Sequence, residues 1–137
     1  MMEIRIAELG DKPHITKYDR HVPDARLDIC IRDSQVMVLC DNGNIIGVLR
    51  WSLFWQTIPF VDLLYVDGAY QNRGLGRNMM AHWEKAMAEM GYSAVMLSTQ
   101  ADETAKFFYE KIGYRKICAF LPPEQEADEL MYLKELK

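Results

Sequence analysis

The fold is decided by one stretch, Val66-Asp67-Gly68-Ala69-Tyr70-Gln71-Asn72-Arg73-Gly74-Leu75-Gly76, which joins an apolar run to an amphipathic one. The run before it, from Phe60 to Val66, is interrupted only by Asp62 and has the pattern of a central strand covered on both faces. After it, apolar residues between positions 77 and 90 recur at helical spacing, and Gly91 follows as a stop signal. The stretch therefore predicts a strand, a loop and a helix in succession. The helix's apolar positions are Met79, Met80, Trp83, Met87 and Met90.

The segments on either side predict a sheet with few crossovers. Residues 35–40 and 45–53 flank an Asn42-Gly43 step that tolerates the positive φ of a tight turn, so they should form a hairpin. Pro13 and Pro23 divide residues 12–32 into two short helices. We expect an α/β fold with a mixed, mostly antiparallel sheet flanked by helices. Its other predicted elements are strands at 3–7, 94–97, 114–120 and 130–136 and a helix at 103–111.

Composition limits the classes of function. A chain of 137 residues, half of them apolar, predicts one domain over residues 1–137. A net charge of -4 argues against a nucleic-acid partner, and three widely spaced cysteines predict buried free thiols in the cytoplasm. The charged N-terminus does not resemble a signal peptide, and no apolar run approaches the roughly 20 residues that span a membrane. The histidines His14, His21 and His82 lack metal-site spacing, so we expect no metal.

The glycine loop has the chemistry of an anion site. Glycines allow close approach, the first N–H groups of a helix lack partners, and the helix dipole favours negative charge. Arg73 and Arg77 could add charge-assisted bonds to a phosphate. The alternative is a plain tight turn before a helix. A Walker loop would need Gly-Lys-Ser/Thr, and a dinucleotide fingerprint would need glycine where Met79 stands, so both fail.

These residues resemble the GNAT family of N-acetyltransferases. Gln71, Gly74 and Gly76 match its central motif, and residues 105–114 are similar to a second family block. The resemblance implies the acyl-CoA N-acyltransferase fold, in which the strands at 60–66 and 94–97 run parallel and splay apart. It also implies acetyl transfer from acetyl-CoA to an amine. The cofactor-binding residues implied are Leu64, Tyr65, Val66, Gln71, Asn72, Arg73, Gly74, Leu75, Gly76, Arg77, Asp102 and Phe107, with the pyrophosphate on the backbone amides of residues 71–77 and the pantetheine arm along residues 64–66.

Two positions depart from the family pattern. Gly68 stands where the family often has proline, a change expected to be harmless. Asp102 stands where the family often has asparagine, which puts a direct contact with pantetheine in doubt. Its alternative role is to cap the helix that follows it.

Two catalytic residues are predicted. The resemblance favours Tyr109 as the general acid for the leaving thiolate, although a core or surface tyrosine is the alternative. Asp62 is the only charge in an apolar strand, so it is the candidate base that deprotonates the amine. Pairing with a nearby arginine or backbone group is its alternative.

The sequence does not identify the acceptor, so a small molecule or a peptide amine remains open. Trp51, Phe54, Trp55 and Phe60 are more often core than recognition surface, although Phe54 and Trp55 could line an acceptor pocket. Aromatic residues near Trp55 are compatible with a homodimer. A non-catalytic acyl-CoA-binding sensor is the rival function, and binding without turnover would distinguish it.

Overall fold

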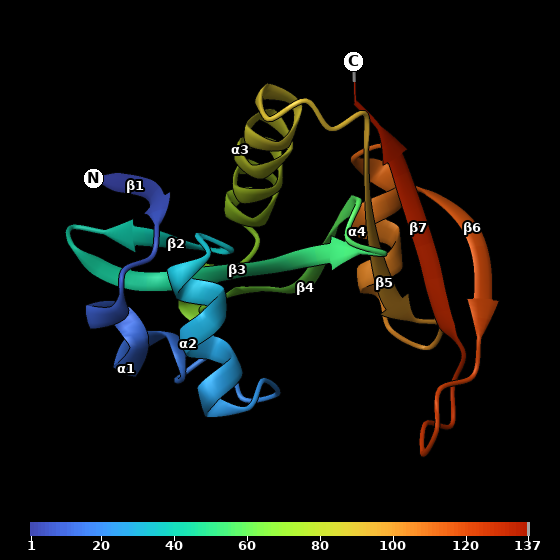
Figure 1. Cartoon of the computed structure of the whole chain (residues 1–137), viewed down its shortest axis with the longest axis horizontal. Coiled ribbons are helices and arrows are strands. Elements are labelled where there is room, and N and C mark those ends of the chain that lie inside the picture. The colour runs from blue at the N-terminus through green and yellow to red at the C-terminus, as the bar shows by residue number, and fades with distance from the viewer. Residues whose placement is uncertain (137) are drawn as a thin grey trace. The chain divides into compact units, whose positions relative to one another are not determined.

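The computed structural model describes residues 1–136, which form two compact units (Figure 1). The N-terminal unit comprises Met1–Ser52 and Val61–Trp83, and the C-terminal unit comprises Leu53–Phe60 and the described residues from Glu84 onward. The strands are β1 (Met2–Ile6), β2 (Val36–Asp41), β3 (Asn44–Phe54), β4 (Ile58–Val66), β5 (Ala94–Gln100), β6 (Arg115–Phe120) and β7 (Glu129–Glu135). The helices are η1 (Leu9–Asp11), α1 (Lys12–Ile15), α2 (Asp24–Arg32), η2 (Gly68–Tyr70), α3 (Leu75–Glu89) and α4 (Ala105–Lys111).

The predicted hairpin is confirmed as β2 and β3. The strands pair antiparallel in a register that places Val38 opposite Val48, and β1 pairs antiparallel with the other edge of β2. Asn42 and Gly43 have φ angles of 50° and 86°, the pair of positive values that a two-residue hairpin turn requires.

The N-terminal unit buries one face of this hairpin under α1 and α2. These are the two short helices predicted between residues 12 and 32, and the structure confirms both. Burying each aliphatic side chain fully contributes about 1.5–3 kcal/mol, so this cluster holds the helices on the strands. Its buried members are Ala7, Ile15, Leu27, Ile31, Val36, Val38, Cys40 and Val48.

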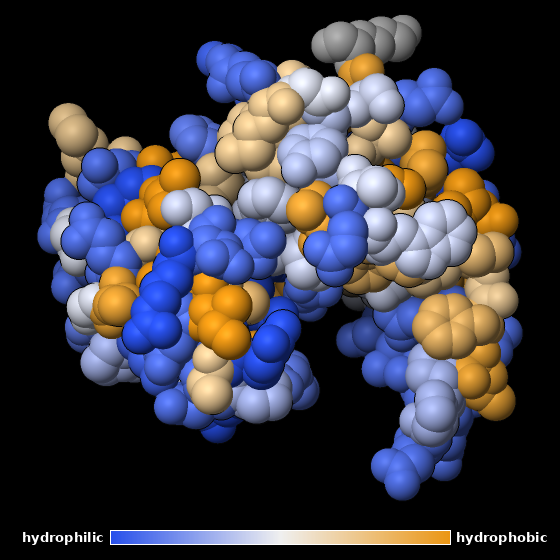
Figure 2. Space-filling model, viewed as in Figure 1, coloured by the Kyte–Doolittle hydropathy of each residue, from blue (hydrophilic) through white to orange (hydrophobic). Residues whose placement is uncertain are grey.

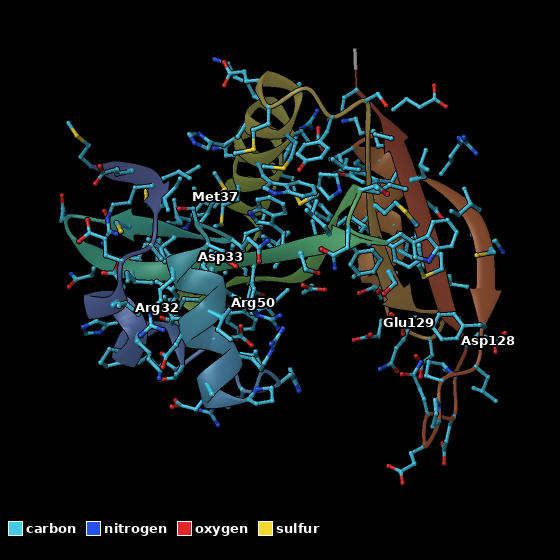
Figure 3. All side chains as sticks on the ribbon, viewed as in Figure 1. Arg32, Asp33, Met37, Arg50, Asp128 and Glu129 are labelled. Atoms are coloured by element: carbon cyan, nitrogen blue, oxygen red, sulfur yellow. The ribbon has the colours of Figure 1, made fainter. Side chains whose placement is uncertain are left out.

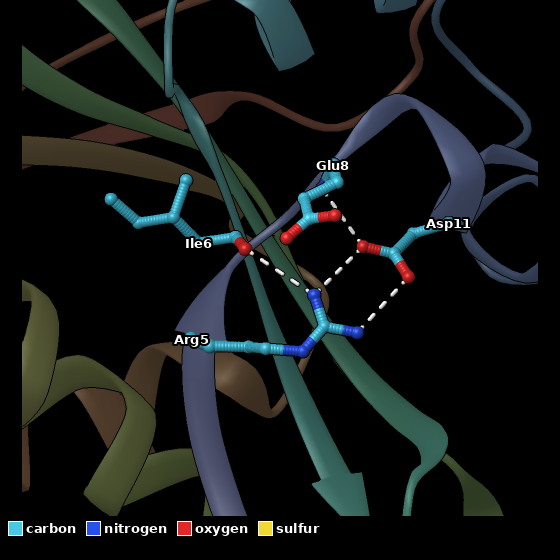
Figure 4. A network of polar contacts seen from close by, with 4 residues as sticks. All are labelled: Arg5, Ile6, Glu8 and Asp11. Carbon is cyan, nitrogen blue, oxygen red and sulfur yellow. Dashed lines mark hydrogen bonds and ion pairs between the residues drawn. The ribbon is translucent and has the colours of Figure 1, made fainter.

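An ion pair between Arg5 and Asp11 stabilises the segment that follows β1. Both terminal nitrogens of Arg5 donate to the Asp11 carboxylate, at 2.8 and 3.0 Å, and the backbone N–H of Glu8 donates to it at 2.8 Å (Figure 4). The bonds from Arg5 lower the pKa of Asp11. One partly buried carboxylate therefore ties η1 and the start of α1 to the end of β1.

The helix after the glycine loop begins two residues earlier than predicted, at Leu75. Met79, Met80 and Trp83 are fully buried, as the spacing predicts. The prediction is wrong for Met90, which is 59 % exposed because the helix ends at Glu89.

The C-terminal unit is built on three antiparallel strands in the order β5-β7-β6. β5 continues to Gln100, three residues beyond the predicted end. Every residue of β6 is exposed, so the prediction that the cysteines are buried thiols is wrong for Cys118 and holds fully only for Cys40.

The surface of the N-terminal unit mixes charged and apolar side chains. Over the N-terminal unit, the face shown in Figure 2 is mostly hydrophilic, with small groups of apolar side chains between charged ones. Among residues 1–136, no helix is both long and apolar enough to cross a lipid bilayer.

Candidate active site

The loop between β4 and α3 presents backbone N–H groups at a helix start. The first α-helical bond of α3 runs from the N–H of Asn78 to the carbonyl of Gly74, at 3.0 Å. The N–H groups of Leu75 to Arg77 precede that bond, so the helix itself gives them no acceptor. Gly74 has a φ angle of +77°, and a Cβ built there would meet nothing within 4 Å. The glycine is therefore required by backbone conformation and leaves open space beside the helix start.

Side chains around the loop fix its shape. Gln71 donates from Nε2 to the carbonyl of Val66 at 2.8 Å, which ties the loop to the end of β4. The Asp67 carboxylate accepts from the N–H of Ala69 at 3.0 Å and from the hydroxyl of Tyr18 at 2.9 Å. Gln71, predicted to bind the cofactor, thus has a structural role in the loop, and its cofactor contact stays a prediction.

Two cations flank the loop. Arg73 lies over the ring of Tyr70 with its guanidinium carbon 5.4 Å from the ring centroid, and Arg77 is exposed in the first turn of α3. Neither joins an ion pair with another residue in the described part of the chain. Their charges add to the positive end of the helix dipole, so the junction is suited to an anionic group.

The strand predicted to run beside the cofactor is β4, and its last residues have a mixed environment. Val66 is buried and Leu64 is half-buried, whereas Tyr65 is 40 % exposed and stacks on Tyr18 at 5.5 Å between centroids. The carbonyl of Val66 already accepts the bond from Gln71. The strand is therefore less completely buried than the apolar sequence indicates.

Asp62 lies in a cluster of charges in the N-terminal unit. Its carboxylate is 3.6 Å from Nη1 of Arg50, which donates through Nε to the fully buried Asp19 at 2.6 Å. Burial, with a smaller contribution from the Asp19 charge, raises the pKa of Asp62, although the Ser52 hydrogen bond and the Arg50 charge lower it. A carboxylate with a raised pKa is a stronger base than an exposed one. The alternative role of Asp62, pairing with an arginine, is present as an ionic contact that is longer than a hydrogen bond.

Asp19, Arg50 and Ser52 were not predicted as part of this cluster. Arg50 is the single charge in the apolar run of β3, the same signal that singled out Asp62 in β4. Asp19 has no such signal, because it follows a four-residue helix in a polar stretch.

Tyr109 lies in the C-terminal unit, on α4. Its ring contacts Phe108 and Tyr114 edge-on, with centroids 5.1 and 6.1 Å away. Burial, with a smaller contribution from the charge of Glu103, raises its pKa to about 12. The hydroxyl therefore keeps its proton at neutral pH and can donate a hydrogen bond.

A partly buried polar network holds the neighbour of Tyr109. The Tyr114 hydroxyl donates to Glu84 at 2.8 Å, and Nζ of Lys134 donates to the other oxygen of Glu84, also at 2.8 Å. Lys134 also donates to the carbonyl of Ile112 at 2.8 Å. Because these bonds join α3, β7 and the end of α4, Tyr109 stands on a rigid support.

The remaining predicted residues of the C-terminal unit are exposed. Asp102 lies in the turn before α4, where Thr104 occupies the N-cap without a side-chain bond. The alternative that Asp102 caps the helix is therefore wrong, because the helix begins at Ala105, beyond the reach of a cap at residue 102. Phe107 is 61 % exposed, with Nζ of Lys106 5.2 Å from its ring centroid.

A cavity of about 540 Å³ lies in the N-terminal unit, lined by residues of the η1–α1 segment, the hairpin turn and the β4–α3 loop. Lys17, Tyr18, Asn44, Asp67 and Tyr70 are among its lining residues, and no predicted catalytic or cofactor-binding residue is. Among residues 1–136, no group of three or more metal-ligating side chains is present.

The structure thus places Asp62, the strand residues 64–66 and the loop residues 71–77 in the N-terminal unit. Asp102, Phe107 and Tyr109 belong to the C-terminal unit.

Comparison with known proteins gives this arrangement a family. The acetyltransferase (GNAT) family matches residues 3–114. The chain is 35 % identical over 83 residues to blasticidin-S acetyltransferase of Streptomyces morookaense, a match that covers 60 % of this chain and 59 % of that protein.

Two solved structures show the same fold. Ard1 from Thermoplasma volcanium has a TM-score of 0.85 at 20 % identity, covering 99 % of this chain and 98 % of that one. N-acetylglutamate synthase from Neisseria gonorrhoeae, complexed with coenzyme A and N-acetyl-glutamate, has a TM-score of 0.83 at 22 % identity. The match covers all of this chain and 35 % of the synthase. The predicted fold, a mixed sheet flanked by helices, is confirmed. The chain belongs to the GNAT acetyltransferase family.

Proposed function

We propose that the chain transfers the acetyl group of acetyl-CoA to a primary amine. The observation that carries the proposal is the junction of β4 and α3, where open space beside Gly74 meets unpaired helical N–H groups and two arginines. Acetyl-CoA supplies a pyrophosphate for this junction and a thioester for the reaction. Membership of the acetyltransferase family supports the same chemistry.

The proposed reaction is a direct attack. The substrate ammonium, with a pKa near 10.4, first gives a proton to Asp62, directly or through a water. The neutral nitrogen then forms a bond to the acetyl carbon while the carbon–sulfur bond breaks and its electron pair goes to sulfur. The nitrogen loses its surplus proton to solvent, which leaves the neutral amide. A backbone N–H polarises the carbonyl oxygen.

Tyr109 stabilises the leaving thiolate in this proposal. A thiol has a pKa near 8.5 and Tyr109 one of about 12, so full proton transfer from Tyr109 is uphill. The hydroxyl therefore acts mainly as a hydrogen-bond donor to sulfur, and solvent later supplies the proton.

We further propose that residues 1–137 act as one N-acetyltransferase domain in the cytoplasm. The three free cysteines are consistent with a reducing compartment. The acceptor is a small-molecule or peptide amine. Trp55, which is 78 % exposed and contacts Phe54 at 4.9 Å between centroids, is the proposed contact of a homodimer.

The test is release of free CoA from acetyl-CoA in the presence of a panel of amines, including blasticidin S, polyamines, aminoglycosides, amino acids and N-terminal peptides. We expect at least one amine to accelerate release and to appear acetylated by mass spectrometry. The Asp62→Asn variant should lose this acceleration. Binding of acetyl-CoA with no acceleration by any amine would instead favour the sensor function.

A further inference from the structure

Arg50 occupies an unusual place for a charged residue. It is the only charge in β3, and its side chain is 11 % exposed. The register of the hairpin places it opposite Val36, whose side chain packs with Leu27 and Ile31 of α2. Arg50 therefore lies on the face of β3 that α2 covers (Figure 3). A buried guanidinium requires partners, because an unpaired charge there is strongly destabilising.

The guanidinium divides its contacts unequally between two carboxylates. Nε donates to Asp19 at 2.6 Å and Nη2 reaches the second oxygen of Asp19 at 3.4 Å. Nη1 is 3.6 Å from Asp62, which is too far for a direct hydrogen bond. Asp19 is fully buried, whereas the side chain of Asp62 is 26 % exposed. The stronger, hydrogen-bonded partner is thus the carboxylate that has no access to a substrate.

We propose that Asp19 anchors the Arg50 guanidinium and holds it back from Asp62, so that Asp62 stays a competent base. Asp19 and Arg50 are then positioning residues that act through Asp62. The inference rests on the proposed function, in which Asp62 deprotonates the amine. Without the anchor, Arg50 could form a bidentate pair with Asp62, and a carboxylate in such a pair is a weaker base.

The groups that face Asp62 agree with this assignment. Arg50 and Ser52 lie on β3, Asp19 follows α1, and Cys30 lies on α2. Burial and the Asp19 charge raise the pKa of Asp62, whereas Ser52 and Arg50 lower it. Two carboxylates and one guanidinium leave the cluster with one net negative charge, which suits a cationic amine.

The test measures the Asp62 carboxyl directly, by its ¹³C chemical shift through a pH titration. In Asp19→Asn we expect the pKa of Asp62 to fall by about one unit, because the released guanidinium approaches it. In Arg50→Gln the pKa should rise by about one unit. Asp33→Asn, an exposed substitution at the end of α2, is the matched control and should leave the Asp62 titration unchanged.

A double variant separates the anchoring effect from the charge of Asp19 itself. In the Arg50→Gln background, Asp19→Asn should lower the pKa of Asp62 much less than in the wild type. An equal lowering in both backgrounds, or none in either, would overturn the proposal. This double variant also removes both partners of the buried pair together, so it avoids leaving one charge unpaired if Asp19→Asn fails to fold.

The titration does not depend on catalytic turnover, so the anchoring role of Asp19 and the proposed acetyltransferase function are tested independently. Shifts as predicted in a protein that acetylates no amine would leave the anchor standing and reject the function. Turnover with an unmoved Asp62 titration would reject the anchor alone. In an active enzyme, the acid limb of the pH–rate profile should move with the titration in each variant.

Discussion

Gly74→Ala tests whether the glycine loop works through its backbone conformation. A left-handed conformation costs an L-residue about 1–2 kcal/mol relative to glycine. The substitution recovers about 0.4–1 kcal/mol by restricting the unfolded chain. A Cβ at residue 74 would meet no atom within 4 Å, so no clash adds to the cost. We therefore expect a net loss of about 1 kcal/mol in the free energy of unfolding.

Gly68→Ala is the matched control in the same loop. Gly68 also faces open space but lacks a positive φ angle, so alanine there should be neutral or stabilise by up to about 1 kcal/mol. Urea unfolding of the two variants beside the wild type measures both effects. Equal stability of all three proteins would refute the reasoning. Calorimetric titration with acetyl-CoA should further show at least tenfold weaker binding for Gly74→Ala alone, if the ligand approaches the Gly74 Cα.

Three other substitutions have outcomes set by their surroundings. Asp62→Asn should lose amine-dependent turnover yet match or exceed the wild-type stability at pH 7. Because the pKa of Asp62 is raised in the folded state, the wild type is most stable below the unfolded-state pKa and loses stability as pH rises through the folded-state pKa. Urea unfolding should therefore show the stabilities of the two proteins converging at low pH. A stability difference that widens at low pH would contradict this. Tyr109→Phe should keep acetyl-CoA affinity and lower kcat by about 10²-fold, as expected for a hydrogen-bond donor to the leaving group. In the wild type, ionisation of Tyr109 should cause no loss of activity up to pH 10, because its pKa is about 12. An unchanged kcat would remove Tyr109 from the mechanism. Gly47→Ala should cost about 1–3 kcal/mol, since a Cβ there would lie 3.2 Å from Leu39 Cβ, Met79 Sδ and the Tyr65 carbonyl oxygen; thermal unfolding at an unchanged temperature would contradict that packing.

Local signals were sufficient to predict the elements around the loop. The Asn42-Gly43 step specified the hairpin because both residues tolerate positive φ angles. Helical spacing identified Met79, Met80 and Trp83 as buried, and the same spacing failed at Met90, where the helix has already ended. Burial at an element's end depends on where the chain turns, which spacing does not encode.

Asp62 could be singled out from the sequence because it is the one charge in an apolar strand. Its partners could not, because the contact between Asp19 and Arg50 joins residues 31 positions apart. The tight packing at Gly47 was also unpredicted, since it depends on three segments that meet only in the folded unit. The role of Gln71 as a tie to Val66 could not be read from the motif, which specifies the residue but not its hydrogen bond.

Calorimetric titration of the purified protein with acetyl-CoA, with CoA and NADH as comparison ligands, tests the central claim most directly. We predict saturable binding of acetyl-CoA and CoA, with no binding of NADH, because the loop lacks the dinucleotide fingerprint. No binding of acetyl-CoA, or equal binding of NADH, would contradict the claim.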